Sequence, residues 1–300
     1  MTITSPHNDH LKQIRKLAAR RRARELAGRF VAEGEDLLAA ADAAGWDAVE
    51  RYCAAGSGLA GVEVSPEALA AVSQLGSGTR ALAVYEQRWA DAPAGPLCVC
   101  LHGIADPGNV GAVLRSALAF GASSVALGPD CADPYGPKAV RASMGALFAV
   151  PLARVSGEPV AAAAAAGERG GPADAAGASA GGSEAAGVGG GVPAGDGTGS
   201  AAGEAAALLA VLPGTTVALD AHRGEPLAAV AAQLDGPVTV LVGAERAGLP
   251  AELLAAADRV ARIPIRGDSL NAAMAATVAL YELTREGAGA PGADRRMPTP

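Results

Sequence analysis

The sequence predicts an α/β protein with two domains, a small N-terminal α/β domain and a larger C-terminal α/β domain built on a parallel sheet. Its 300 residues exceed one average domain of about 100–150 residues. Hydrophobic residues make up 50% of the chain and aromatic residues only 3%, so the core is expected to be aliphatic. Strand-like and helix-like segments alternate along the second part of the chain, which is typical of βαβ units and a parallel sheet.

The N-terminal domain is expected to span residues 1–92. It opens with a basic helix in residues 11–29, continues with a strand at residues 30–34 (FVAEG) and ends with a strand at residues 81–85 (ALAVY). Residues 91–96 (DAPAGP) then predict a linker, because Pro and Gly interrupt both helices and strands.

The C-terminal domain is expected to span residues 96–286. Strands are predicted at residues 97–101, 124–127, 217–219, 238–242 and 261–265, and helices at residues 110–120 and 270–283. Residues 160–207 consist largely of Ala and Gly, so they bury too little to offset the entropy of ordering and are expected to form a disordered insertion. Residues 287–300 are expected to be a flexible tail.

Positive charge is concentrated near the N-terminus. The whole chain has a net charge of −7, whereas residues 11–29 contain eight Lys or Arg side chains against one Glu. Such asymmetry is typical of a surface that meets phosphate, and a solvated helix face is the alternative. Arg outnumbers Lys here, and a guanidinium can pair with two phosphate oxygens at once. The candidate nucleic-acid contacts are Lys12, Arg15, Lys16, Arg20, Arg21 and Arg22.

The cysteine content favours a reducing compartment. Four Cys in a chain with no apolar leader and no apolar run of about 18 residues fit the cytoplasm better than a disulfide framework, and no membrane contact is expected. Cys98 and Cys100 lie two apart on a predicted strand without a second pair of ligands. They are therefore expected to be buried thiols rather than a zinc site, and no metal is expected.

Three Gly-bearing loops each follow a predicted strand and precede a predicted helix, at residues 106–109 (DPGN), 243–248 (GAERAG) and 266–271 (RGDSLN). In a parallel sheet all three lie at the carboxyl ends of strands, where open α/β sheets bind ligands, so they are expected to converge on one crevice. Each loop alone is more often a simple turn, and Asn109 or Ser269 more often caps a helix. Their shared position favours a binding site.

Arg115 lies beside the apolar stripe of the helix that is expected to begin at Val110, with Asn109 as its cap. Helical side chains lean toward the N-terminus, so the guanidinium is expected to point back toward the 106–109 loop, where the helix dipole favours an anion. A phosphate or sugar phosphate fits that position. A surface salt bridge is the alternative.

These loops resemble the three motifs of the SpoU/TrmH branch of the SPOUT RNA methyltransferases. The matching residues are 106–111 (DPGNVG) with Arg115, 243–245 (GAE) with Gly248, and 263–264 (IP) followed by 269–271 (SLN). Residues 141–146 (RASMGA) resemble the family as well. Residues 30–35 (FVAEGE) resemble the segment of members that carry a ribosomal-protein-like substrate-binding domain. Together the resemblance covers nearly everything except the Ala/Gly-rich insertion and the tails.

The resemblance implies transfer of a methyl group from S-adenosylmethionine to a ribose 2′-hydroxyl in structured RNA, ribosomal or transfer, by a homodimer. It also implies a deep trefoil knot in the C-terminal domain, which general topology rules argue against. By position, Gly243, Ile263 and Leu270 are implied to line the methyl donor. The residues implied to form the catalytic site are Asn109, Glu245, Ser269 and Asn271, with Arg115 acting on the ribose.

This chemistry needs no metal, because a sulfonium donor is already activated and the protein mainly aligns the reacting atoms and helps the hydroxyl lose its proton. Arg115 stays protonated to about pH 12, so stabilisation of a developing alkoxide or a neighbouring phosphate is expected of it, and service as a base stays open.

Two other classes of function stay open. A non-catalytic RNA-binding protein on the same scaffold would lose the donor site, and the intact motif residues of the three loops argue against it. An α/β enzyme that binds another nucleotide would need a phosphate or ribose fingerprint, and the C-terminal domain contains neither a Walker loop nor GxGxxG.

Overall fold

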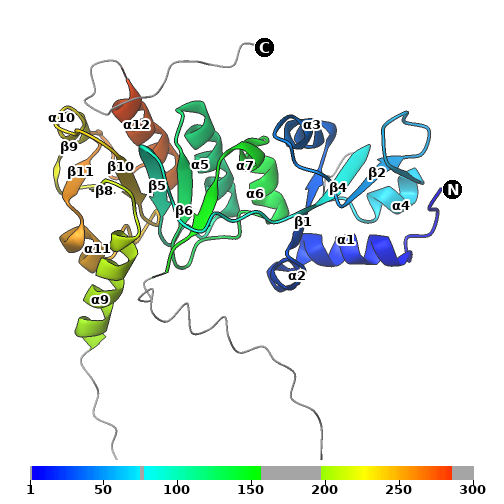
Figure 1. Ribbon diagram of the computed structural model, residues 1–300, viewed down its shortest axis with the longest axis horizontal. Helices are drawn as coiled ribbons and strands as arrows, with labels where there is room; N and C mark the ends of the chain where they lie inside the picture. Colours follow the sequence, from blue (N-terminus) through cyan, green and yellow to red (C-terminus); the bar gives the residue numbers. More distant parts are fainter. Residues whose placement is uncertain (1, 75–77, 157–196, 286–300) are drawn as a thin grey trace, which may run out of the picture.

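A computed structural model of the chain describes residues 2–74, 78–156 and 197–285, and its two sheets lie in two lobes joined side by side (Figure 1). The N-terminal lobe has a four-stranded sheet in the order β1-β4-β2-β3, in which β4 is antiparallel to both of its neighbours. The elements of this lobe are α1 (Asp9–Ala19), α2 (Arg21–Ala27), β1 (Arg29–Glu33), α3 (Glu35–Ala43), β2 (Glu50–Ala54), β3 (Val62–Val64), α4 (Pro66–Ala70) and β4 (Ala81–Glu86).

The C-terminal lobe has a seven-stranded sheet in the order β7-β6-β5-β10-β8-β11-β9, and every neighbouring pair is parallel. The elements are β5 (Leu97–Leu101), α5 (Pro107–Ala119), β6 (Ser124–Leu127), α6 (Pro137–Ala142), α7 (Ala146–Ala149), β7 (Leu152–Arg154), α9 (Gly197–Ala210), β8 (Thr215–Leu219), β9 (Glu225–Pro226), α10 (Leu227–Ala231), β10 (Val238–Val242), α11 (Ala251–Ala256), β11 (Arg259–Arg262) and α12 (Ala272–Thr284). The predicted α/β class with a parallel sheet is confirmed.

Helices cover both faces of the parallel sheet, so its central strands are buried on both sides. In β5, Leu97, Val99 and Leu101 belong to the core that contains α5, α10 and α12, whereas Cys98 and Cys100 belong to the core that contains α9 and α11. The alternation follows from the two-residue period of a strand. Both thiols are free and fully buried, and burial raises their pKa, which confirms the prediction for these residues.

The predicted strands at residues 97–101, 124–127 and 238–242 coincide with β5, β6 and β10. The strand predicted at residues 261–265 is wrong at both ends, because β11 runs from Arg259 to Arg262. Pro264 has no N–H to donate to a ladder, and the chain leaves the sheet before it.

The Ala-rich helix α9 corrects another expectation. Residues 197–210 are helical, so the disorder predicted for residues 160–207 is wrong from residue 197 onward. Ala205 and Leu208 are buried in one cluster with Leu253 of α11. Alanine has the highest helix propensity, so a helix forms here with few large apolar residues. The rest of the predicted insertion and the predicted tail lie outside the described residues.

The two lobes share one hydrophobic core. The ring centroids of Phe30, Tyr85 and Trp46 lie 6.1, 5.3 and 5.2 Å from that of Phe148 in α7. Trp46 Nε1 also donates to the Phe148 carbonyl at 2.8 Å, and the Phe30 ring lies 4.7 Å from that of Tyr135. The few aromatic residues of the chain are therefore concentrated where the lobes meet.

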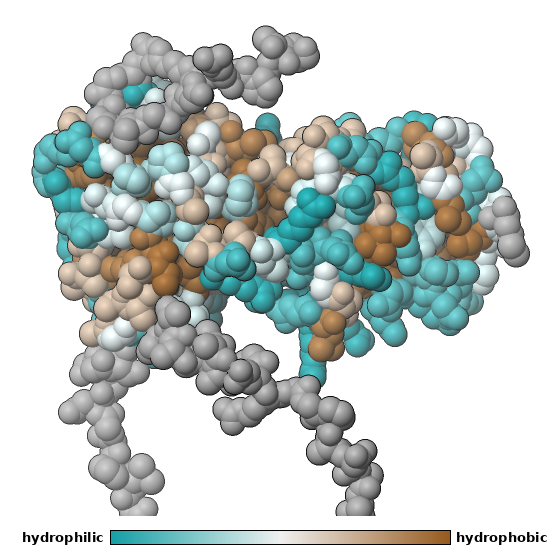
Figure 2. Space-filling model, viewed as in Figure 1, coloured by the Kyte–Doolittle hydropathy of each residue, from teal (hydrophilic) through white to brown (hydrophobic). Residues whose placement is uncertain are grey.

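The surface differs between the lobes. In the view of Figure 2 the N-terminal lobe is largely hydrophilic, whereas apolar residues gather at several places over the C-terminal lobe. Within the ranges that the structure describes, no helix combines the length and the apolar character that crossing a bilayer requires.

Candidate active site at the carboxyl edge of the parallel sheet

The three Gly-bearing loops meet at one edge of the seven-stranded sheet, after β5, β10 and β11. They bring together Asn109, Glu245 and Asn271, although Asn109 and Asn271 are 162 residues apart in sequence. Asn271 Nδ2 donates to Asn109 Oδ1 at 3.1 Å and to Glu245 Oε1 at 2.9 Å, and Asn109 Nδ2 donates to the same Glu245 oxygen. These three residues are called the Asn–Glu–Asn triad below.

Helix caps position two of the three loops. Asn271 is the N-cap of α12, where its Oδ1 accepts from Ala273 N at 2.9 Å while its Nδ2 serves the triad. Asp106 is the N-cap of α5, where its carboxylate accepts from Gly108 N at 2.8 Å. The expectation that Asn109 caps this helix is therefore wrong. It lies inside the first turn of α5, and its side chain reaches across to the other two loops.

A cavity of about 470 Å³ opens beside the triad. The three residues implied to hold the methyl donor, Gly243, Ile263 and Leu270, all line it, together with Glu245 and Ser269. The structure therefore gathers these five residues around one space. Asn109, Asn271 and Arg115 are not part of its lining.

The loop after β10 requires glycine at its first position. A Cβ on Gly243 would lie 2.3 Å from the carbonyl carbon of Gly248 and 2.4 Å from Leu249 N. Gly248 has a φ of 67°, in the left-handed region, and its N–H donates to the Ala244 carbonyl at 2.8 Å. The loop thus folds back tightly, and at Gly243 the cavity wall is backbone with no side chain over it.

One wall of the cavity is not among the loops predicted from the sequence. Leu219 ends β8, which lies between β10 and β11, and residues 220–222 follow it; all four residues line the cavity. Burial alone would raise the pKa of Asp220, but the backbone N–H groups of His222 and Arg223 donate to its carboxylate and lower the pKa. The rule applied to the other three loops finds this one as well, because residues 220–223 follow a predicted strand.

The first turn of α5 is held against α6. Lys138 Nζ lies 2.7 Å from Asp106 Oδ1, and this hydrogen bond, followed by the one from Gly108 N, lowers the pKa of Asp106. A Cβ on Gly111 would lie 2.4 Å from the Ala139 carbonyl oxygen, so glycine is needed for the two helices to approach this closely.

Arg115 lies on the exposed face of α5, six residues beyond Asn109. No hydrogen bond or ion pair engages its guanidinium in the described part of the chain, so the alternative of a surface salt bridge has no partner there. A guanidinium that is charged, exposed and unpaired is available to an anionic ligand.

The basic N-terminal segment is two helices rather than one, because the backbone of Arg20 is extended (φ −127°, ψ 119°) between α1 and α2. Three of the candidate nucleic-acid contacts are engaged within the protein. Lys12 Nζ lies 2.9 Å from Asp9 Oδ1, Arg15 donates to a backbone carbonyl, and Arg21 Nε lies 2.8 Å from Glu25 Oε1.

The other three candidates, Lys16, Arg20 and Arg22, are exposed. None of them has a side-chain partner among the residues that the structure describes. The free positive charge of this segment is therefore smaller than its sequence indicates.

In the described ranges, no three His, Cys, Asp or Glu side chains are grouped so that they could hold a metal ion.

Residues 96–181 and 202–281 match the SpoU rRNA Methylase family, and these segments amount to more than half of the chain. The chain belongs to the SpoU rRNA methylase family. The resemblance drawn from the three loops is thereby confirmed, because the matched segments contain all three of them. They also contain the β8 loop that completes the cavity wall.

Two curated relatives with similar sequences are named as tRNA/rRNA methyltransferases. A protein of Mycobacterium tuberculosis named as an uncharacterized tRNA/rRNA methyltransferase is 33% identical over 190 residues, which are 62% of this chain and 51% of the relative. A Synechocystis protein of the same description is 30% identical over 175 residues, which are 53% of this chain and 64% of the relative. The chain thus spans between about half and two thirds of the length of these relatives.

Solved structures of methyltransferases have a similar fold over both lobes. An rRNA methyltransferase from Sinorhizobium meliloti is 26% identical with a TM-score of 0.69, and the similarity covers 94% of this chain and 96% of that one. The SpoU methyltransferase AviRb of Streptomyces viridochromogenes, in complex with AdoMet, is 26% identical with a TM-score of 0.67 over 93% of this chain and 98% of that one.

Proposed function

We propose that this SpoU family protein transfers a methyl group from S-adenosylmethionine to RNA. The observation that carries the proposal is the Asn–Glu–Asn triad at the edge of a 470 Å³ cavity, because the cavity has the size of a small-molecule site, about 300–1,000 Å³. The similar structures from S. meliloti and S. viridochromogenes contain bound AdoMet, which supports this donor.

The residues of the cavity suit such a donor. Ile263 and Leu270 supply apolar surface for a base, and glycine at position 243 lets the loop fold back tightly beside the cavity. Asp220 and Glu245 supply carboxylates, which suit hydroxyl groups and the positive charge of a sulfonium. When bound, S-adenosylmethionine supplies a methyl group that is already activated for transfer.

The triad has a holding role in this proposal. Two amide N–H groups, from Asn109 and Asn271, converge on Glu245 Oε1, so this oxygen is occupied. Glu245 therefore anchors the two amides across the loops through this oxygen. Ser269 lies beside Leu270 at the cavity wall and is exposed, so its hydroxyl is available to the acceptor RNA or the donor.

Arg115 contributes charge in this proposal. Its guanidinium is exposed and unpaired in the described chain, and a guanidinium carries a positive charge that suits an anion. We assign it to a phosphate of the RNA or to the developing negative charge on the acceptor oxygen. The acceptor is the ribose 2′-hydroxyl, which the motif resemblance implies and a similar structure described as an RNA 2′-O ribose methyltransferase supports (TM-score 0.62, 25% identity).

A second copy of the chain is expected to cover α5 and α12. Leu118 of α5 and Met274 and Tyr281 of α12 expose 48%, 61% and 54% of their surface, and the two helices pack side by side through a Ser116–Thr277 hydrogen bond. Exposed apolar side chains on neighbouring helices suit a homodimer interface. Light scattering on the purified protein tests this, and a monomer at every concentration would contradict it.

The proposed activity is tested in two steps. Calorimetry with S-adenosylmethionine, NAD and ATP, each with and without a chelator, should show binding of the first ligand alone and no effect of chelation. Mapping of 2′-O-methylation in ribosomal and transfer RNA from cells with and without the protein then identifies the acceptor. Methylation of a base, or of no RNA, would contradict the proposal.

Arg115→Ala tests the catalytic assignment. Loss of one preorganised charged group at an oxyanion costs on the order of 10²–10³ in rate, and single-turnover methylation should show a loss of this size with unchanged donor affinity. Arg115→Lys keeps the charge without the planar fork, so it separates charge stabilisation from bidentate positioning. Transfer at the wild-type rate by Arg115→Ala would exclude Arg115 from the reaction.

A further inference from the structure

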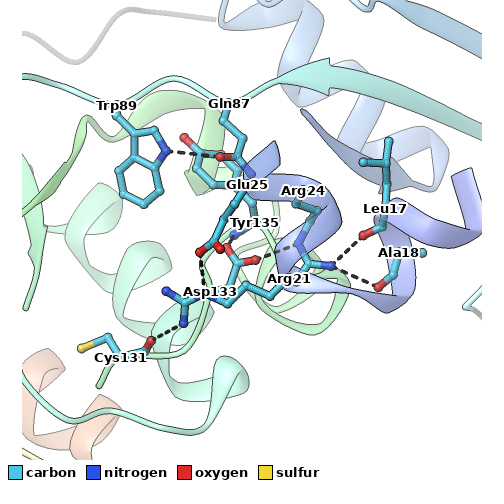
Figure 3. A network of polar contacts seen from close by, with 10 residues as sticks. All are labelled: Leu17, Ala18, Arg21, Arg24, Glu25, Gln87, Trp89, Cys131, Asp133 and Tyr135. Carbon is cyan, nitrogen blue, oxygen red and sulfur yellow. Dashed lines mark hydrogen bonds and ion pairs between the residues drawn. The ribbon is translucent and has the colours of Figure 1, made fainter. Parts of the chain in front are cut away.

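A buried ion pair joins the two lobes outside the candidate active site. Arg24 Nε in α2 lies 2.7 Å from Asp133 Oδ2, in the segment between β6 and α6, and the two side chains are only 6% and 10% exposed (Figure 3). Arg24 was predicted to lie within the basic segment that faces solvent. Instead its guanidinium is turned into the protein, toward a residue 109 positions away.

Both partners are held by further hydrogen bonds. Arg24 Nη1 donates to the carbonyls of Leu17 at 2.6 Å and Ala18 at 3.2 Å, which belong to the last turn of α1 and lack helical donors. Asp133 Oδ1 accepts from Tyr135 N at 2.9 Å. The ion pair therefore connects α1, α2 and the 129–136 segment at a single point. The Nε and Nη1 donors of Arg24 thus have fixed acceptors, which hold the guanidinium in one orientation.

Two neighbouring hydrogen bonds also link the two lobes. Arg21 Nη1 donates to the Cys131 carbonyl at 3.2 Å, and Tyr135 Oη accepts from Arg88 N at 3.1 Å. Around the ion pair, Figure 3 shows Arg21 and Arg24 coming from one lobe and Cys131, Asp133 and Tyr135 from the other. Helix α2 is thus a structural connection between the lobes.

The segment that Arg24 holds also supports the active-site loop. Gly103 N donates to the Pro129 carbonyl at 2.9 Å, and Ala132 N donates to the Ile104 carbonyl at 2.8 Å. The chain from Ile104 leads directly to α5, whose first turn carries Asn109 of the triad. These two hydrogen bonds tie the 129–136 segment to the chain that leads into α5.

We propose that Arg24 and Asp133 are positioning residues for the RNA substrate. They hold the free cations of the N-terminal lobe at a fixed place relative to the Asn–Glu–Asn triad, so an RNA bound by the first lobe presents its acceptor nucleotide to the second. Two contacts on a rigid frame raise the effective concentration of the second contact. This inference rests on the proposed function, because it requires an RNA that touches both lobes.

The variant that tests the pair is Arg24→Met/Asp133→Asn. It removes both charges together, so no unpaired charge is left buried, and the amide oxygen at position 133 still accepts from Tyr135 N. The matched control is Arg51→Met, which breaks the Arg51–Asp42 ion pair inside the N-terminal lobe. Arg24→Lys keeps a positive charge at this position, so it is expected to keep part of the fixed placement of the two lobes.

The first measurement gives the distance between the two lobes and needs no RNA. Spin labels at Glu67→Cys in α4 and Ala255→Cys in α11 lie on exposed positions of different lobes, and the four native cysteines are buried. We expect a narrow distance distribution in the labelled wild type and in Arg51→Met, and a clearly broader one in the double variant. An unbroadened distribution in the double variant overturns the positioning role, whatever the activity.

The second measurement uses rRNA from a strain that lacks the protein. We expect the KM for this RNA to rise about tenfold or more in the double variant, with kcat and donor affinity nearly unchanged, because rigid two-point attachment contributes that much or more to apparent affinity. An unchanged KM, or an equal rise in Arg51→Met, overturns the proposal. Failure of the proposed function is distinguishable, because the wild type itself would then leave the RNA unmethylated.

Discussion

Asn271 has two structural roles, as a helix cap and as an amide donor in the triad, and substitutions can separate them. Its Oδ1 caps α12 by accepting from Ala273 N, and its Nδ2 donates to Asn109 and Glu245 in the triad. Asn271→Ser keeps an oxygen that can cap the helix but removes the amide donor. Asn271→Ala removes both.

The contacts give the expected size of each loss. Loss of the N-cap costs about 1 kcal/mol of the free energy of unfolding. Each triad hydrogen bond contributes about 0.5 kcal/mol, the lower end of the usual range, because Asn271 and Glu245 are exposed to water. We therefore expect Asn271→Ala to lose about 2 kcal/mol and Asn271→Ser about 1 kcal/mol.

Methyl transfer should depend on the amide donor of Asn271 and not on the oxygen that caps α12. Urea unfolding gives the two stabilities, and single-turnover methylation of RNA at saturating donor gives the rate. Both variants are expected to lose methyl transfer to the same degree, although Asn271→Ser is the more stable of the two. Wild-type transfer by Asn271→Ser would refute the reasoning, because Asn271 would then act only as a helix cap.

Three further predictions concern the donor loop, the basic helices and pH. Gly243→Ala should abolish S-adenosylmethionine binding in calorimetry and lower the thermal midpoint, because its Cβ would lie 2.3 Å from backbone; donor binding at wild-type affinity would contradict the loop geometry. Arg20→Ala/Arg22→Ala should weaken RNA binding and flatten its salt dependence while donor affinity holds, and an unchanged salt slope would leave these residues as solvated charge. Hydrogen bonds from the Thr216 backbone and hydroxyl lower the pKa of Asp258, so its contribution to stability is present above the ordinary carboxyl pKa and is lost as pH falls through the lowered value. Asp258→Asn should remove that part of the acid loss of stability, as seen in urea midpoints measured from about pH 3 to 7, and an equal acid loss in the variant would contradict it.

The parallel lobe and its binding edge could be predicted from the sequence because they depend on local patterns. Apolar runs of strand length marked β5, β6 and β10 at their observed ends. The loops after them carry glycine at positions where a side chain would collide, as at Gly243. A parallel sheet places all such loops at one edge, so even the convergence of distant residues followed from the order of elements.

The N-terminal lobe was less predictable, because its side chains are oriented by contacts with the other lobe. The pattern of residues 11–29 indicated one continuous basic surface, whereas the structure breaks it at Arg20 and buries Arg24. Burying a guanidinium is unfavourable unless a partner is buried with it, and the partner, Asp133, lies in a segment that the local pattern does not connect to α2.

The sequence by itself determined the fold class, the family and the three loops of the candidate site, because hydrophobic period and glycine placement act over a few residues. Only the tertiary structure decided that Asn109 belongs to a triad rather than a helix cap, and that Arg24 joins the lobes. Each of these depends on which segments, distant in sequence, the fold brings together. Strand order in the parallel sheet decides this for the loops, and the packing of the two lobes decides it for Arg24.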